Sequence, residues 1–339
     1  MRWPCELMLS GLLAGMLCLP VRAASALPHG PGLAGKHPGD RGIARDRAVV
    51  FAEDFEEGSL PQVERRWTQT SDEKGKLLSL SADVPPGSAG KTSLLFTHVG
   101  GHGDGGHLYK VLSPGFDRLY LRFYVKFDPQ CYPIHHFVHL GGYNPPTPWP
   151  QGGAGERPAS DRAYSTGVEP QGTAWVWDYY TYWGEMRGSP PRGQTWGNSF
   201  IRDPKLTVAR GRWICVELMM KVNDVGDSNG EMALWLNGKP VSHLGKGFPK
   251  GKWIFDKFVP GEGGEGLRWN DRTGTRESFQ TPAGGEPFEG FRWRTTPRLK
   301  LNFLWLLDYI TDAPVGHVSK VWFDDVVVAR QYIGPLRAR

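Results

Sequence analysis

Two runs of alternating apolar and polar residues between Trp213 and Val241 predict a β-hairpin, around which we arrange the rest of the chain. Every second residue of the range Ile214–Val222 is apolar, and Met232 and Leu234 continue the pattern after a turn rich in Asp, Asn and Gly. The hairpin therefore has one core face. Its other face mixes aromatic and charged side chains, and we expect that face to meet solvent or line a cleft.

The same alternation recurs along the chain and predicts an all-β protein. The segment 118–127, RLYLRFYVKF, alternates strictly and carries Arg122 and Lys126 on its polar face. Further strands are predicted in the ranges 49–57, 135–143, 163–169, 175–183, 299–307 and 321–329. No helix longer than a turn or two and no internal repeat is predicted. We expect an antiparallel two-sheet β-sandwich whose first and last strands pair.

The amino-terminal sequence predicts export. Arg2 precedes an apolar run from Leu7 to Val21, and small residues follow up to Ala26, which is the layout of a secretory signal peptide. The run is shorter than the roughly 20 residues that span a bilayer, so a membrane anchor is disfavoured. We expect a signal peptide over residues 1–26, a flexible leader over 27–47 and one domain over 48–335, in a secreted or periplasmic protein that no membrane holds after cleavage.

Composition adds loops, a mild positive charge and two cysteines to this picture. The 339 residues include 45 Gly, 28 Pro and 14 Trp, and this composition favours many turns and long loops. The range 245–297 is a long segment of this composition, and we expect it to form a wall of a cleft. The formal net charge of +5 suits a polyanionic partner but occurs equally in secreted proteins without one. Cys131 and Cys215 lie outside the signal peptide, and we expect either a disulfide between them or two buried thiols.

Two predicted strands concentrate side chains that can transfer protons or stack on sugars. His136 and His139 lie in the first, and Tyr180, Tyr182 and Trp183 lie in the second. Imidazole and phenol groups exchange protons, and an aromatic ring matches the apolar face of a pyranose. Each of these residues alone is equally explained as a core or rim residue. Together they predict a carbohydrate site.

Three stretches resemble concanavalin A-like jelly-roll proteins, in particular the alginate and glucuronan lyases. They are LWLNGKPV in the hairpin, DFE near residue 55 and FDDVVVA at 323–329. In those lyases one strand of the concave sheet carries Ser and Arg and another carries a Y-x-Y pair. Ser165 matches the serine, and Tyr180 and Tyr182 match the tyrosines. The family's KLPGL text has no counterpart in 135–143, and Gly167 stands where the arginine is expected.

The resemblance implies a lyase that cleaves an acidic, uronate-containing polysaccharide by β-elimination. This reaction needs a group that neutralises the carboxylate, a base for the C5 proton and an acid for the departing oxygen. The candidates for base and acid are Tyr180, Tyr182, His139 and His136. The candidates for substrate binding are Arg122, Lys126, Ser165, Trp183 and Asn302. We expect no cofactor in catalysis.

Two aspartates are candidates for a structural calcium site. Asp54 and Asp324 lie in the two terminal strands that we expect to pair, and Asp325 follows directly. Carboxylate oxygens are the ligands that Ca²⁺ prefers, and jelly-roll domains of this kind often hold the ion. Plain turn and edge acids explain the same residues.

Two alternatives to a lyase remain open at this stage. A non-catalytic lectin needs stacking aromatics but no base. A retaining glycoside hydrolase needs two carboxylates about 5 Å apart, and the chain has no E-x-D-x-x-E text to supply them. Nucleic-acid-binding motifs are absent as well, so the expected partner is an anionic polysaccharide, bound by a monomer. Convergence of His139 and Tyr182 in one cleft would favour the lyase.

Overall fold

The computed structural model describes residues 26–188, 193, 195–248, 251–254, 257–260, 265–270, 275–280 and 286–337. The predicted signal peptide therefore lies outside the described residues, apart from its last residue, Ala26. Within these ranges no helix has the length and apolar character needed to cross a membrane.

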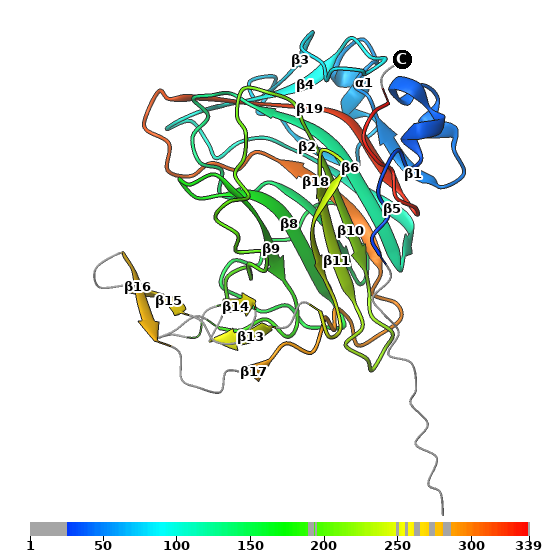
Figure 1. The fold of residues 1–339 in the computed structure, drawn as a ribbon. Helices are drawn as coiled ribbons and strands as arrows, with labels where there is room; N and C mark the ends of the chain where they lie inside the picture. Colours follow the sequence, from blue (N-terminus) through cyan, green and yellow to red (C-terminus); the bar gives the residue numbers. More distant parts are fainter. Residues whose placement is uncertain are drawn as a thin grey trace, which may run out of the picture.

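Two antiparallel sheets face each other across one core, which confirms the predicted β-sandwich (Figure 1). The larger sheet has the order β12-β11-β10-β6-β19-β4-β3, with β1 paired to β19. Its strands are β1 (Val49–Glu53), β3 (Leu78–Ser81), β4 (Ser93–Val99), β6 (Arg118–Phe127), β10 (Ile214–Lys221), β11 (Glu231–Leu236), β12 (Lys239–Leu244) and β19 (Val318–Ala329).

The smaller sheet has the order β2-β5-β18-β7-β8-β9. Its strands are β2 (Gln69–Ser71), β5 (His107–Phe116), β7 (Val138–Tyr143), β8 (Ala163–Gln171), β9 (Val176–Tyr182) and β18 (Leu301–Leu307). Helical structure is limited to α1 (Leu60–Glu64) and to 3-10 turns at Ala34–Lys36, Pro38–Asp40 and Ile43–Arg45 in the described residues. The segment predicted to be a long loop contains the short strands β13 (Gly251–Ile254), β14 (Lys257–Pro260), β15 (Glu265–Asn270), β16 (Thr275–Gln280) and β17 (Glu286–Pro287).

Strands β10 and β11 form the predicted hairpin, with Val216 opposite Leu236 and Met220 opposite Met232. The face of the hairpin that carries these residues packs in the core between the sheets. Its other face is buried as well, which corrects the expectation of solvent or a cleft. Trp235 is only 1% exposed, because its ring packs on Tyr332 near the end of the chain.

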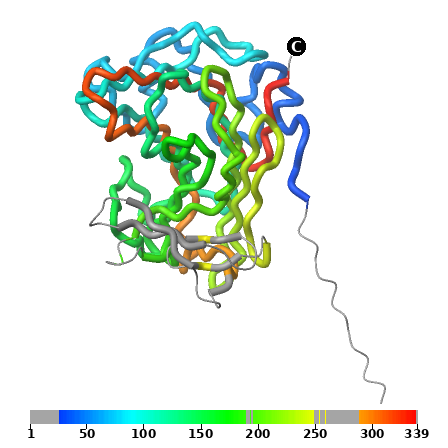
Figure 2. Tube along the Cα trace, turned by 60° about the vertical axis from the view of Figure 1, so that its left-hand side comes forward, coloured from blue at the N-terminus to red at the C-terminus, as the bar shows by residue number. Residues whose placement is uncertain are grey.

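The segment 27–47 covers this outer face of the larger sheet and is not the flexible leader that its Gly and Pro content predicted. Its 3-10 turns bury Leu33 and Ile43 in a second apolar cluster. The amide of Leu33 donates to the carbonyl of Tyr332, so the segment lies against the carboxyl-terminal residues (Figure 2). The prediction failed because isolated apolar residues anchor irregular turns without any periodicity.

The terminal strands pair as predicted, with Phe51 of β1 opposite Val328 of β19. The disulfide alternative, in contrast, is wrong, because Cys131 and Cys215 are both free and buried. Cys131 belongs to the core between the sheets. Cys215 alternates with core residues on β10 and therefore faces the outer side of the larger sheet, opposite Tyr124 of β6. The sheet itself separates the two thiols.

Candidate active site

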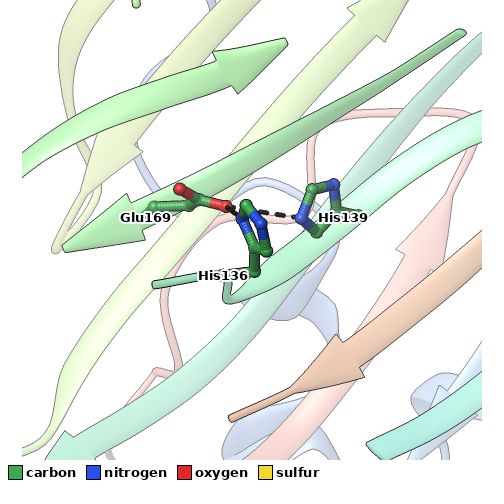
Figure 3. A group of neighbouring side chains, drawn as sticks. All are labelled: His136, His139 and Glu169. Carbon is green, nitrogen blue, oxygen red and sulfur yellow. Dashed lines mark hydrogen bonds and ion pairs between the residues drawn. The ribbon is translucent and has the colours of Figure 1, made fainter. Parts of the chain in front are cut away.

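Two imidazoles and a carboxylate meet on the outer face of the smaller sheet, the side turned away from the core (Figure 3). His139 lies on β7 and Glu169 on the adjacent β8, while His136 lies in the segment that enters β7. Val138 and Val168 are directly opposite each other and point into the core. Their neighbours His139 and Glu169 therefore project to the other face. We call these three residues the His–Glu cluster.

One oxygen of Glu169 lies close to both imidazoles and connects the three residues of the cluster. Its Oε1 accepts a hydrogen bond from Nδ1 of His136 over 3.3 Å and lies 3.4 Å from Nε2 of His139. The side chains of His139 and Glu169 are 7% and 3% exposed, whereas that of His136 is 23% exposed. The second contact lacks hydrogen-bond geometry, so Nε2 of His139 is buried without a hydrogen-bond partner. Solvent reaches the cluster at His136.

Two tyrosines extend the cluster along β9. Tyr180 is opposite Gly167 and Tyr182 is opposite Ser165 in the β8–β9 register. The two hydroxyl groups lie 3.4 Å apart and share a hydrogen bond. The ring of Tyr180 lies 4.9 Å from that of His136, centroid to centroid, so phenol and imidazole groups form one continuous surface.

The stacking of Tyr309 on His136 continues this surface beyond the sheet. The two ring centroids are 5.5 Å apart and their planes differ by 14°. The backbone of His136 also forms a bridge with that of Tyr309. His136 is therefore fixed from both sides, by Glu169 at its Nδ1 and by Tyr309 at its face.

Burial and charge set the protonation states of the cluster. Burial by itself would raise the pKa of Glu169, but the interactions with His136 and His139 outweigh it and hold that pKa below its ordinary value. Burial lowers the pKa of His139 and raises the pKa values of Tyr180 and Tyr182. At neutral pH the carboxylate is therefore ionised, and both phenols keep their protons.

Arg122 and Lys126, which we predicted to bind substrate, are not part of the cluster, because β6 belongs to the larger sheet. Arg122 is fully buried and forms an ion pair with Asp40 of the amino-terminal segment. Lys126 pairs with Asp83 and lies over the ring of Trp322 at 4.3 Å. Both cations thus have partners on the side of the molecule opposite the cluster.

The other predicted binding residues divide between the cluster and the scaffold. Ser165 is half-buried on the cluster's face of β8. Asn302 binds the backbone of the neighbouring strand. Its side-chain NH₂ group donates to the carbonyl of Tyr143, and its side-chain oxygen accepts a hydrogen bond from the backbone N–H of Tyr143. Trp183 is 1% exposed and donates to Asn198. It borders a surface pocket that no member of the His–Glu cluster lines.

The aspartates proposed for calcium do not form one described set of ligands. Asp54 has ligand atoms near those of Glu53 and Glu57, and Arg66 already forms ion pairs with both of these glutamates. Asp324 is buried, and its Oδ1 accepts the backbone amide of the next residue over 2.7 Å. The calcium site stays a prediction.

Glu169 and Tyr309 are site residues that the sequence analysis missed. Glu169 was detectable, because the alternation of the segment 163–169 places it on the same face as Ser165. Tyr309 follows the last residue of β18 by two positions and reaches His136 through an irregular backbone bridge. No period in the sequence signals such a contact.

The fold is that of known polysaccharide lyases. No protein-family model matches the chain, and no curated protein is similar to it in sequence. A mutant of alginate lyase Aly36B in complex with alginate tetrasaccharide is 12% identical, with a TM-score of 0.51 over 83% of this chain and 96% of that one. The PL-14 alginate lyase from Aplysia kurodai is 12% identical, with a TM-score of 0.51 over 83% and 99%. Alginate lyase vAL-1 from Chlorella virus is 12% identical, with a TM-score of 0.50 over 83% and 99%.

At this identity the likeness defines the class of fold, a polysaccharide-lyase-like jelly-roll β-sandwich. The chemistry must be argued from the residues of this chain.

Proposed function

We propose that the protein is a secreted or periplasmic lyase that cleaves an acidic, uronate-containing polysaccharide by β-elimination. The observation that carries the proposal is the convergence of the His–Glu cluster with Tyr180 and Tyr182 on one outer sheet face. The polysaccharide-lyase-like fold supports it. A lectin would need the aromatic rings but would gain nothing from a buried carboxylate bound to two imidazoles.

β-Elimination moves one proton from carbon to oxygen in two steps. A base takes the C5 proton, the electron pair left behind forms the C4=C5 double bond, and the C4–O bond breaks. An acid then protonates the departing sugar oxygen, so atoms and charge balance without water. The reaction is possible only when a positive group offsets the carboxylate that is attached to C5.

We assign proton transfer to the two tyrosines and carboxylate binding to the cluster. The base is the phenolate that forms when one of the two hydroxyls gives up its proton, and the hydrogen bond from the other hydroxyl stabilises it. The phenolate takes the C5 proton, the other hydroxyl donates its proton to the departing oxygen, and transfer between the two tyrosines restores the starting state. Their protonated resting state fits the acid that the departing oxygen requires. His136 is the most exposed member of the cluster, so the substrate carboxylate reaches the cluster there, and the positive charge that offsets it has to come from a proton or a cation bound at the cluster.

The direct experiment is to incubate the mature protein with alginate, glucuronan, pectate and glycosaminoglycans. The new double bond absorbs ultraviolet light, so a rise in absorbance with any polymer confirms the reaction and names the substrate. Binding to a polymer without any absorbance change would instead establish the lectin function. If the protein neither binds nor cleaves any of these polymers, the proposal is overturned.

A further inference from the structure

The His–Glu cluster has the composition and spacing of a metal site. It offers two imidazole nitrogens and one carboxylate oxygen, and one ligand atom from each residue lies within 4.8 Å of the other two. Two imidazoles with one carboxylate are a donor set that catalytic zinc sites use, with a further position left for water or substrate. Ca²⁺ and Mg²⁺ prefer oxygen ligands and fit this set poorly.

The two distances from Glu169 to the imidazoles suit a bound metal ion. Ligand atoms about 2.1 Å from a tetrahedral ion lie about 3.4 Å from one another. In the structure Oε1 of Glu169 lies 3.3 Å from Nδ1 of His136 and 3.4 Å from Nε2 of His139. These separations are longer than a good hydrogen bond, for which 2.7–3.2 Å is usual, and match the edges of a coordination tetrahedron.

The unpartnered nitrogen of His139 points independently to a ligand. This side chain is 7% exposed, and its Nε2 has no hydrogen-bond partner although it faces Glu169. A buried polar atom left without a partner costs free energy, and coordination to an ion would satisfy it. Gly167 keeps the space clear, since a Cβ atom there would lie 3.0 Å from this same nitrogen.

We propose that His136, His139 and Glu169 bind one divalent transition-metal ion of the Zn²⁺ class, with an open coordination position toward the solvent side at His136. With neutral imidazoles the cluster carries the single negative charge of Glu169, which repels a uronate. A bound divalent ion reverses the net charge to +1 and supplies the positive group that neither Arg122 nor Lys126 can bring to this face. This role in substrate binding rests on the proposed function, but the metal site itself does not.

Metal binding is tested on the mature, chelator-treated protein by calorimetric titration with Zn²⁺ alone. We expect one ion per chain, and we expect Co²⁺ in the same site to give the intense visible absorption of low-coordinate cobalt. His136→Ala and Glu169→Gln should each weaken Zn²⁺ binding at least tenfold. Circular dichroism and thermal melting show whether each variant is folded, and His136→Ala is the milder change because its side chain is partly exposed.

The matched control is His243→Ala. His243 also faces a glutamate, with its Nε2 3.1 Å from Oε2 of Glu231, but that carboxylate pairs with Lys221 rather than with a second imidazole. This variant should bind Zn²⁺ as the wild type does. The absence of a one-to-one site, or equal affinity in wild type, His136→Ala and Glu169→Gln, would overturn the metal site.

Measurements of Zn²⁺ binding and of polymer cleavage on the same protein distinguish this inference from the proposed function. If the protein binds Zn²⁺ at the cluster but cleaves none of the polymers, the metal site is confirmed and the lyase function is contradicted. If the metal-free protein cleaves a polymer at the full rate in the presence of chelator, the lyase function is confirmed and the role of the metal in substrate binding is contradicted.

Discussion

Gly167 faces His139 across the β7–β8 pair, and a Cβ atom built on the glycine would lie 3.0 Å from Nε2 of the imidazole. The same atom would lie 2.8 Å from Oε1 of Glu169. Real Cβ contacts are essentially never that short, so the His–Glu cluster forms because this position has no side chain. A residue without a functional group thereby determines the geometry of the site.

Gly167→Ala should therefore lower the rate of polymer cleavage by about a hundredfold, since a displacement of about 1 Å at a reacting group has that effect. The rate of increase in ultraviolet absorbance measures it. Gly153→Ala is the control, because nothing lies within 4 Å of a Cβ atom there. Wild-type activity in Gly167→Ala would show that contact between His139 and Glu169 is irrelevant to the reaction.

Tyr182→Phe should reduce the rate by roughly a hundredfold or more, because it removes a proton-transfer hydroxyl and keeps the ring. Tyr332→Phe provides the comparison, since that hydroxyl donates to the carbonyl of Gly30 near the chain ends. It should leave the rate unchanged. Full activity in both Tyr182→Phe and His139→Ala would place the active site elsewhere on the molecule.

Asp40→Asn should lower the free energy of unfolding by about 3–5 kcal/mol, because it leaves the charge of fully buried Arg122 without its partner. Denaturation in urea measures the change. Asp83→Asn breaks the pair with Lys126, in which Asp83 is 44% exposed, and should cost less than about 1 kcal/mol. Similar losses in the two variants would contradict the assignment of Arg122 to the scaffold.

Asp308 should make the protein less stable as the pH rises. Burial raises the pKa of this carboxyl to about 7, and neither of its oxygens has a hydrogen-bond partner. The folded state therefore binds more protons than the unfolded state between the ordinary pKa of about 4 and this raised value, so stability falls across that window. Asp308→Asn cannot ionise and should gain stability relative to wild type as the pH rises from 5 to 8, by about 1.4 kcal/mol for each pH unit up to the raised pKa of about 7.

The comparison for this pH effect is Asp161→Asn, which makes the same substitution at an exposed position. Melting temperatures of the three proteins at both pH values decide the matter. A constant difference between wild type and Asp308→Asn would show that Asp308 is ionised throughout.

Cys131 and Cys215 should react with a thiol reagent only after denaturation, because both are buried and burial raises both thiol pKa values. The melting temperature should be the same with and without reductant. A mass about 2 Da below that of the reduced chain would reveal a disulfide and contradict the structure.

Alternation in the sequence predicted the local structure well, and it could not predict what covers each face. It placed Val216 and Leu218 in the core and Arg122 on the opposite side of its own strand, as observed. Whether that side meets substrate depends on residues 27–47, which reach it from far along the chain. Their anchors, Leu33 and Ile43, sit in turns without a period.

The site was predictable in kind but not in arrangement. His136, His139, Tyr180 and Tyr182 were recognisable because imidazole and phenol groups are concentrated in two strands. The contact of the two imidazoles with Glu169 depends on the register of β7 against β8, and one residue of slippage would turn the carboxylate into the core. A single sequence does not fix that register.

The position of β19 has a consequence for how the chain is made. This strand comprises Val318–Ala329, yet it lies between β6 and β4 and also pairs with β1. A growing chain therefore lacks the middle of its larger sheet until synthesis is almost complete, and pairing across such sequence distances is slow. A premature stop codon anywhere before residue 318 therefore leaves no fragment that can close the sandwich.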